Sequence, residues 1–446
     1  MTPHTHLSRR RLLRLGGGLG AAALGGGLSG CGSTLDAEPL TSGTVDLSFW
    51  THDVAYVDFF RAAAENRAGT TPFEWQLNPT IVGARDVVTK MIAQAIAGRG
   101  TPDVAGLEIN QFPRVLRGEL AAELLEPLND AVADVREDLL TVRTAPFTKD
   151  GNLYALDSDT PLAVYYYRQP EFERVGMPTD IGSWEEFLDA ATRAHERHGV
   201  SFGAVVTGGS DLTAVVQSYE MLLLQNGGML FDEDGRLALD SPEAERSLDF
   251  LVRGVQSGVF STVSDYYGPA MQAALHNNQV IGLWMATWYK VYGLMPNVPD
   301  QSGQWRIRPL PVFRDGGSRA SFLGGTGFAS LRGKENTQGG IELIRAAYLT
   351  PEEQIRRYQE LGYLPTRRSV FDDPALLRIE DEYCGGQRMF EVYRDIVDEA
   401  PVFYLSADRP VIDTVLSGYL LRAYNGDMSP REALERATDD FEGQTR

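Results

Sequence analysis

Residues 44–53 of this chain read Thr-Val-Asp-Leu-Ser-Phe-Trp-Thr-His-Asp. Polar and apolar residues alternate through the first seven positions, as is typical of a strand with one buried face. The sequence after this strand predicts a helix over 58–68, a strand over 73–77, a helix over 86–97 and a strand over 102–107. Strands that alternate with helices in this way indicate an α/β fold built on a parallel sheet.

The rest of the chain predicts further α/β structure and then a helical C-terminal third. A long extended stretch is expected over 154–168, and helices predominate from residue 334 onward. Ser183 stands at an expected helix N-cap with Glu186 three residues later, which is the pattern of a capping box. The pair Asp234-Gly235 lies between apolar flanks and predicts a hairpin. Because domains usually hold ~100–200 residues, a chain of 446 residues is expected to form two or three folding units.

The N-terminal segment has the layout of an export signal. Paired arginines precede a short apolar run rich in Gly and Ala, which resembles a twin-arginine signal. This run is too short for a transmembrane helix, which needs ~20 apolar residues. The sequence Leu-Ser-Gly-Cys at 28–31 resembles a bacterial lipobox, in which the cysteine is lipidated. We therefore expect residues 1–30 to be a signal peptide. Lipidated Cys31 should anchor the chain to the outer face of the bacterial cell membrane, with residues 31–43 as a tether.

Composition excludes several classes of partner and site. The chain has 61 acidic and 41 basic residues, a formal net charge of −20, and the expected signal removes only basic charge. Such a surface repels phosphate backbones, so no nucleic-acid partner is expected. With Cys31 acylated, Cys384 has no partner for a disulfide within the chain. Six histidines and one spare cysteine leave little material for a transition-metal site, so we expect no metal and no cofactor.

The motifs of common enzyme classes are missing from the sequence. It contains no His-Glu-x-x-His, no Gly-x-Ser-x-Gly and no P-loop. The glycine-rich run at 324–327 lacks the spacing of a dinucleotide-binding loop. Glycoside hydrolysis needs a pair of carboxylates, but a chain with 61 acidic residues offers many such pairs by chance. Their presence is therefore not evidence for a glycosidase. The motifs alone therefore point to no enzyme class.

Aromatic and polar residues gather at the ends of three expected strands, at 50–53, 108–111 and 284–288. In open α/β sheets, ligands bind outside the carboxyl ends of the strands. Tryptophan stacked on the apolar face of a sugar, with Asp, Asn and Gln bound to its hydroxyls, suits a carbohydrate. The alternative is that these tryptophans are core residues, which is what we expect for Trp75, Trp184 and Trp305.

Twelve short segments, spread in order over nearly the whole expected mature chain, carry a resemblance to a known family. They are Leu47-Ser48-Phe49-Trp50-Thr51, Gly100-Thr101-Pro102-Asp103-Val104, Gly118-Glu119-Leu120 with Leu125-Glu126-Pro127-Leu128, Asp150-Gly151-Asn152-Leu153-Tyr154-Ala155-Leu156, Tyr165-Tyr166-Tyr167, Ser183-Trp184-Glu185-Glu186-Phe187, Asn226-Gly227-Gly228, Ile281-Gly282-Leu283-Trp284, Leu310-Pro311, Gly324-Gly325-Thr326-Gly327, Thr350-Pro351-Glu352-Glu353-Gln354 and Gly362-Tyr363-Leu364-Pro365-Thr366-Arg367. The set resembles the extracellular solute-binding proteins of ABC importers, in the group with maltose- and oligosaccharide-binding lipoproteins.

The resemblance implies a periplasmic-binding-protein-like fold of class II type: two α/β lobes that are joined by crossing segments and close on a ligand by hinge motion. We expect the first lobe to comprise residues 44–158 and 282–330. The second lobe is expected to comprise residues 159–281 and 331–446.

The resemblance also implies a set of ligand contacts, with Trp284 as the stacking platform. Matched segment by segment, they are Trp50, His52, Asp53, Asn110 and Gln111 from the first lobe, Asp159 near the first crossing, Gln217, Trp284 and Trp288 facing the second lobe, Gly325 and Thr326 through backbone groups, and Tyr363 and Arg367 at the far side.

One departure from the family pattern bears on the ligand. The family usually has Tyr-Asn-Lys after the crossing strand, where this chain has Tyr167-Arg168-Gln169. If Arg168 reaches the cleft, an anionic sugar becomes plausible. The alternative is a surface ion pair between Arg168 and Glu171 or Glu173.

These observations together predict a monomeric, lipid-anchored component of an importer. The resemblance implies that it is not an enzyme, and that it binds a sugar or oligosaccharide reversibly and delivers it to the transmembrane subunits of an ABC permease. One alternative is a secreted glycosidase or other hydrolase. Another is the same fold with a different solute, such as a polyol, glycerol phosphate or a polyamine.

Overall fold

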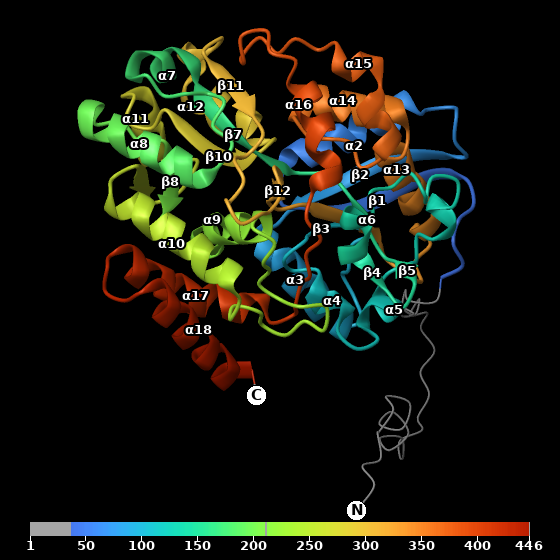
Figure 1. Cartoon of the computed structure of the whole chain (residues 1–446). Helices are drawn as coiled ribbons and strands as arrows, with labels where there is room; N and C mark the ends of the chain where they lie inside the picture. Colours follow the sequence, from blue (N-terminus) through green and yellow to red (C-terminus); the bar gives the residue numbers. More distant parts are fainter. Residues whose placement is uncertain (1–36, 210–211, 446) are drawn as a thin grey trace, which may run out of the picture.

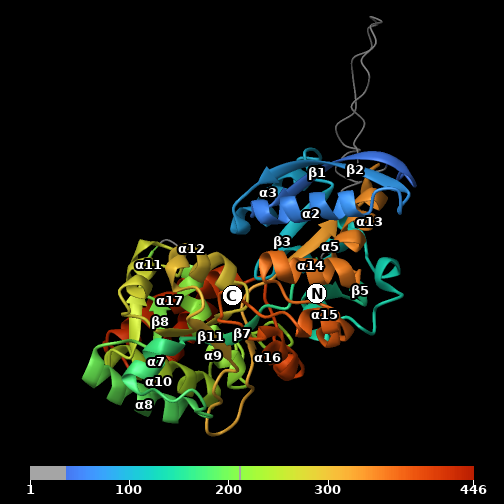
Figure 2. The ribbon, with the colours of Figure 1, turned by 90° about the horizontal axis from the view of Figure 1, so that it is seen from above.

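The computed structural model describes residues 37–209 and 212–445, which form two lobes (Figures 1 and 2). The expected signal peptide, Cys31 and the first part of the tether lie outside the described residues. Each lobe has its own cluster of buried apolar side chains. No helix in the two described ranges has both the length and the apolar character needed to cross a membrane.

The first lobe is built around a five-stranded sheet in the order β2-β1-β3-β13-β6. As the sequence predicts, β1 (Gly43–Thr51) pairs in parallel with β2 (Phe73–Ile81) and β3 (Val104–Glu108). Two further strands, β13 (Thr326–Ser330) and β6 (Leu156–Asp157), extend the sheet in antiparallel pairing. The sheet therefore joins strands that lie far apart in the sequence.

Helix α2 (Val54–Asn66) begins four residues earlier than the sequence predicts, because Asp53 caps it. The Ala55 backbone N–H donates to Asp53 Oδ1 at 2.9 Å, which satisfies one of the free donors at the helix N-terminus. On its buried side, the Phe60 ring lies 4.7 Å from the ring of Phe328 in β13. The other elements of this lobe are α3 (Ala84–Ile96), α4 (Pro113–Leu116), α5 (Leu120–Leu124), η2 (Asp130–Val132), α6 (Thr141–Thr144), η3 (Ala145–Phe147), β4 (Thr148–Lys149), β5 (Asn152–Leu153), α13 (Thr337–Tyr348) and α14 (Pro351–Leu361).

The second lobe is organised by β7 (Leu162–Arg168), the extended stretch that the sequence predicts. It pairs in antiparallel fashion with β10 (Gly282–Ala286), β11 (Trp305–Arg308) and β12 (Ser321–Phe322), while β8 (Gly203–Val206) and β9 (Phe260–Val263) form a separate parallel pair. The other elements are α7 (Gln169–Val175), α8 (Trp184–His198), α9 (Leu212–Gln225), α10 (Pro242–Gln256), α11 (Pro269–His276), η4 (Lys290–Leu294), α12 (Met295–Asn297), η5 (Pro299–Gln301), η6 (Arg368–Asp372), α15 (Pro374–Leu377), α16 (Met389–Ile396), η7 (Val397–Glu399), α17 (Arg409–Tyr424) and α18 (Pro430–Thr445).

Two local predictions in this lobe are confirmed. The Glu186 backbone N–H donates to Ser183 Oγ at 3.3 Å, so Ser183 is the N-cap of α8. The predicted hairpin forms around Gly235, with an antiparallel bridge between Phe231 and Leu237.

The structure divides the lobes differently from the expected boundaries. Of the segment 282–330, which was expected in the first lobe, β10, β11 and β12 pair with β7 and belong to the second. Only β13 crosses over, because it pairs with β3. Helix α13, expected in the second lobe, packs instead against α2 and β13 of the first. The boundaries were wrong because strand pairing between distant segments cannot be read from the order of the chain.

One buried guanidinium ties together two of the segments that cross between the lobes. Arg143 is 1% exposed, and its Nη2 lies 2.5 Å from Oδ2 of Asp157, the last residue of β6 before the chain crosses to β7. The same nitrogen donates to the Gly324 carbonyl at 3.2 Å, in the crossing from β12 to β13. Gly325 has a φ of +135°, and a Cβ there would lie 2.2 Å from Arg143 Nη2. This position therefore requires glycine.

Candidate functional site

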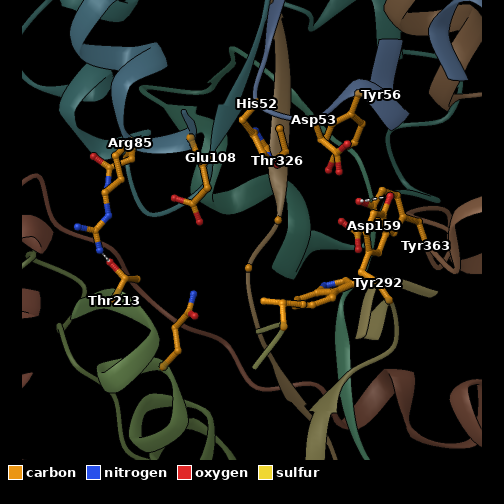
Figure 3. A pocket seen from close by; sticks show the side chains of 17 residues that line it. His52, Asp53, Tyr56, Arg85, Glu108, Asp159, Thr213, Tyr292, Thr326 and Tyr363 are labelled. Carbon is orange, nitrogen blue, oxygen red and sulfur yellow. Dashed lines mark hydrogen bonds between the residues drawn. The ribbon is translucent and has the colours of Figure 1, made fainter. Parts of the chain in front are cut away.

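A cavity of about 490 Å³ lies between the two lobes (Figure 3). It is lined by His52, Asp53, Tyr56, Ala84, Arg85, Glu108, Gln111, Asp159, Thr213, Gln217, Tyr267, Trp288, Tyr292, Gly324, Gly325, Thr326 and Tyr363. Its volume falls within the ~300–1,000 Å³ that is usual for small-molecule sites. We call this cavity the cleft.

The wall formed by the first lobe follows from the sheet. His52 and Asp53 come directly after β1, and Glu108 is the last residue of β3. Thr326 begins β13 and pairs with Glu108 across the antiparallel register. The carboxyl ends of β1 and β3 and the start of β13 therefore lie at one edge, where ligands of open α/β sheets bind.

The wall formed by the second lobe comes from a helix and from connecting segments. Thr213 and Gln217 lie on α9, one helical turn apart. Trp288 follows the end of β10 by two residues, and Tyr292 lies in η4. Tyr267 precedes α11 and is 48% exposed. The second lobe therefore contributes three aromatic rings to the cleft.

Aromatic rings form a broad apolar surface at one end of the cleft. The rings of Tyr267 and Trp288 stack with centroids 6.4 Å apart and an interplanar angle of 24°. The rings of Tyr292 and Tyr363 stack at 6.0 Å and 20°, and their hydroxyls lie 3.3 Å apart. Flat rings of this kind offer area for stacking, and the tyrosine hydroxyls add polar groups.

Asp159 is a buried carboxylate in the wall of the cleft. It is 2% exposed, and its Oδ1 accepts a hydrogen bond from Ser158 Oγ at 2.9 Å. Its Oδ2 has no hydrogen-bond partner among the described residues. Burial raises the pKa of this carboxyl, and the charge of Arg143 opposes the rise. Because an unpaired buried acceptor costs ~1–3 kcal/mol, Oδ2 favours a ligand that brings a donor.

Glu108 lines the cleft beside an ionic cluster of the second lobe. Arg409, on α17, is fully buried and donates to both carboxylate oxygens of Glu220 at 2.7 Å and to Asp413 Oδ1 at 2.7 Å. It also donates to Asn110 Oδ1 of the first lobe at 3.3 Å. Burial raises the pKa of Glu108 to about 7, although the charge of Arg409 opposes the rise.

The charged groups that line the cleft are mainly acidic. Three carboxyls, those of Asp53, Glu108 and Asp159, face one guanidinium, that of Arg85. Burial lowers the pKa of His52, and the charge of Asp53 opposes this effect only in part. His52 is therefore neutral at pH 7. With one guanidinium among these groups, the cleft offers an anion little positive charge to bind.

The structure brings nine of the thirteen expected contact residues together around the cleft. They are His52, Asp53, Gln111, Asp159, Gln217, Trp288, Gly325, Thr326 and Tyr363. Trp50, Asn110, Trp284 and Arg367 do not line it.

The expectation that Trp284 is the stacking platform is corrected by its position in the core. Trp284 is 1% exposed, and its ring lies 4.9 Å from Phe260 and 5.8 Å from Trp184. All five residues of β10 are buried, so both faces of this strand are covered. The strand runs on to Ala286, and Trp288 is the tryptophan that reaches the cleft.

Trp50, Asn110 and Arg367 are also displaced from their expected places. Trp50 is 6% exposed within β1, and Lys90 Nζ lies 4.4 Å from its ring. Asn110 is buried, and its Oδ1 accepts a hydrogen bond from Arg409. Arg367 Nε donates to Asp138 Oδ2 at 2.7 Å and lines a separate pocket on the first lobe.

Arg168 takes neither of the roles considered for it. It donates to Gln304 Oε1 at 2.9 and 2.7 Å and also to Asn278 Oδ1. It does not line the cleft, and Glu171 pairs with Arg174 instead. Arg168 therefore gives no reason to expect an anionic ligand.

Sequence reasoning missed several residues of the cleft: Tyr56, Ala84, Arg85, Glu108, Thr213, Tyr267, Tyr292 and Gly324. Glu108 could have been found, because it ends the third strand at the edge already singled out. Tyr56 lies on the first turn of α2, three residues after Asp53. Arg85, Thr213, Tyr267 and Tyr292 come from helix starts and connections, where no sequence pattern marks them. Across the described ranges, no group of His, Cys, Asp and Glu is arranged to hold a metal ion.

Comparison with known proteins gives the family and the fold. The family model described as "Bacterial extracellular solute-binding protein" matches residues 75–355. Two proteins named arabinooligosaccharide-binding protein are each 26% identical to the chain over 90% of its length. The match covers 89% of the length of the protein from Halalkalibacterium halodurans and 92% of the length of the protein from Bacillus subtilis.

Two solved structures show the same architecture. The GacH receptor of Streptomyces glaucescens, described unliganded and with acarbose, superposes with a TM-score of 0.70 at 21% identity, covering 90% of this chain and 98% of its own. The cyclic alpha-maltosyl-1,6-maltose binding protein from Arthrobacter globiformis gives 0.73 at 19% identity, covering 90% and 99%. The two-lobed binding-protein fold expected from the sequence is confirmed.

Proposed function

We propose a function for the cleft from one premise: the chain belongs to the family of bacterial extracellular solute-binding proteins. Its solute, we propose, is a sugar or short oligosaccharide that binds reversibly between the lobes. The protein then delivers this ligand to the transmembrane permease of an ABC importer. Ligand held by both lobes stabilises the closed form, and this differential affinity is what a permease can recognise.

The observation that carries the proposal is Asp159 beside stacked aromatic rings. Its buried Oδ2 needs a donor, and a sugar hydroxyl supplies one. The rings of Trp288 and Tyr267 lie in the same cleft and offer a surface for the apolar face of a sugar ring. Gln111 and Gln217, from opposite walls, add amide groups that both donate and accept.

The relatives support the choice of ligand class. Two of them are named for arabinooligosaccharides. Among the described residues, the one guanidinium that lines the cleft, that of Arg85, already donates to Thr213, which argues against an anionic solute such as glycerol phosphate or a uronic acid. A polyamine is the second candidate, because carboxylates next to tyrosine faces also suit a cation.

We further propose that the protein does no chemistry on its ligand. The relatives that the chain matches are binding proteins. The sequence also lacks the motifs of the common hydrolase classes. A hydrolase would convert its ligand, whereas a binding protein returns it unchanged, and this difference decides between the two.

The test is a thermal-shift screen with product analysis of every compound that gives a shift. The probes are arabinooligosaccharides, maltooligosaccharides, galacturonic acid and spermidine. A ligand at 100 times its dissociation constant adds ~2.7 kcal/mol of stability, and we expect such stabilisation from a neutral sugar recovered intact. Consumption of the sugar would identify a hydrolase. Stabilisation by spermidine alone would replace the sugar with a polyamine.

A matched pair of variants tests the carrying observation. Asp159→Asn keeps the shape of the side chain but replaces one acceptor with a donor, so the ligand-induced shift should be lost. Asp150→Asn is the control, since Asp150 lies in a turn outside the cleft with a φ of 51° that asparagine also adopts. If the ligand raised the melting temperature of both variants equally, Asp159 would not be a ligand contact.

The place of action is part of the proposal. The chain works outside the cytoplasm, which its family supports, and a twin-arginine signal is removed so that lipidated Cys31 becomes the first residue. Incorporation of a labelled fatty acid into the wild type but not into Cys31→Ala tests the anchor. The protein is monomeric, and light scattering of the mature form tests that.

A further inference from the structure

We propose that Arg85 and Thr213 form an end wall of the cleft and thereby limit the length of the oligosaccharide that it takes. This inference rests on the proposed function, because it names the size class of the same ligand. If these two side chains set the maximum length of the ligand, mutating them changes that length and leaves the aromatic residues at the other end of the cleft in place.

The two residues meet across the cleft from opposite lobes. Arg85 lies at the start of α3 in the first lobe, and Thr213 lies at the start of α9 in the second. Both line the cleft, and Arg85 Nη2 donates a hydrogen bond to Thr213 Oγ1. Figure 3 shows the two side chains reaching toward each other, at the end away from Tyr292 and Tyr363. A ligand cannot extend past this point while the bridge is formed.

Thr213, the second-lobe partner in this hydrogen bond, is held in place by the ionic cluster of the second lobe. Thr213 Oγ1 donates to Asp413 Oδ2 at 3.0 Å, so the hydroxyl accepts from Arg85 and donates to Asp413. Asp413 Oδ1 in turn accepts from Arg409 Nε at 2.7 Å. Thr213 and Arg409 are both buried, so Thr213 cannot turn away without breaking this chain of bonds.

Two further contacts hold the lobes together near this end. Arg409, besides binding Asp413, donates to Asn110 of the first lobe at 3.3 Å. Arg117 of the first lobe donates to Asp408, the N-cap of α17, at 3.0 Å. A longer ligand therefore meets a wall whose two sides are tied together beyond the bridge itself.

The opposite end of the cleft is different in kind. It carries the stacked rings of Tyr292 and Tyr363 and the carboxyls of Asp53 and Asp159 (Figure 3). A cavity of about 490 Å³ between this end and the wall holds a ligand of a few sugar units at most. We expect a terminal unit of the ligand to lie against Arg85 and Thr213.

The experiment measures affinity against chain length for the mature protein and for Arg85→Ala. Neutral oligosaccharides of one to six units, from the series that stabilises the wild type, are titrated by calorimetry. The wild type should lose at least about tenfold in affinity once the ligand exceeds the space inside the wall, a ratio worth 1.4 kcal/mol. In Arg85→Ala this loss should move to longer chains, measured relative to the affinity of the same variant for the shortest ligand that it binds.

Two more variants make the outcome decisive. Thr213→Ala removes the other half of the bridge and should shift the length profile in the same direction. Arg61→Ala is the control, because Arg61 is an exposed arginine of the same lobe outside the cleft. Arg85 is itself exposed, so its truncation should leave the melting temperature nearly unchanged.

The possible failures can be told apart. If no sugar binds the wild type, the proposed function is wrong. If short sugars bind and the length profile of Arg85→Ala matches that of the wild type, the end wall is wrong and the proposed function stands. A general loss of affinity at every length would assign Arg85 to ligand contact or lobe closure instead.

Discussion

Two tryptophans four residues apart have different roles: one belongs to the core of the second lobe and the other to its ligand surface. Replacing each with alanine in turn tests this difference. Trp284 is 1% exposed within β10, in contact with Trp184 and Phe260, whereas Trp288 is partly exposed in the cleft. Truncation of each to alanine removes the same indole from two different environments. Trp284→Ala should lower stability and leave affinity nearly intact, and Trp288→Ala should do the reverse.

The size of the stability effect follows from burial. Replacing a buried Trp with Ala costs ~3–5 kcal/mol, from lost transfer energy and from the cavity left behind. In a domain of about 150–250 residues, each kcal/mol lowers the melting temperature by ~2–4 °C. Trp284→Ala should therefore melt about 6–20 °C below the wild type. Trp288→Ala should stay within a few degrees, because its ring gives up less buried contact.

Differential scanning calorimetry and ligand titration of the same preparations measure both quantities. The expected result is a crossed pattern: one variant loses stability and the other loses affinity. If Trp284→Ala kept its melting temperature and lost ligand binding, the assignment of Trp284 to the core would be refuted. If Trp288→Ala bound the sugar as tightly as the wild type, the aromatic end would not be the ligand surface.

Three further perturbations have definite outcomes. Burial raises the folded-state pKa of Glu108 from 4.5 to about 7, so its ionisation should cost stability as pH rises between these values. In Glu108→Gln the free energy of unfolding should therefore fall less between pH 4.5 and 7, by about 1–3 kcal/mol. Urea unfolding at a series of pH values measures this difference. Gly325→Ala should lose ~1–3 kcal/mol, because its Cβ would meet Arg143; an unchanged urea midpoint would contradict this. Arg367→Ala breaks the bond to Asp138 outside the cleft and should lower the melting temperature without changing ligand affinity by calorimetry.

Local patterns in the sequence predict the elements of this fold well. The alternation around Phe49 marks β1, and the capping box at Ser183 marks the start of α8, because both depend on neighbouring residues. The boundaries of the lobes depend on pairing between segments far apart in the chain. Nothing near Trp284 or Trp305 in the sequence indicates that β10 and β11 pair with β7, so most of 282–330 was assigned to the wrong lobe.

The candidate site shows the same division. His52 and Asp53 could be placed at the cleft because a parallel strand ends just before them. Trp284 was misplaced because its strand ends at Ala286, two residues later than expected, and a strand covered on both faces buries every side chain. Arg85 and Thr213 gain their role only from the approach of two helix starts, which no spacing in the sequence records.

The pairing of β13 with β3 has a consequence for how the protein is made. Glu108 leaves the ribosome long before Thr326, its partner in the sheet, has been synthesised. At ~5–20 residues per second, the nascent first lobe carries an unpaired β3 edge for on the order of ten seconds or more. During that interval the exposed edge is open to chaperones and export factors. We therefore expect the sheet of the first lobe to be completed only after Ser330 has been synthesised.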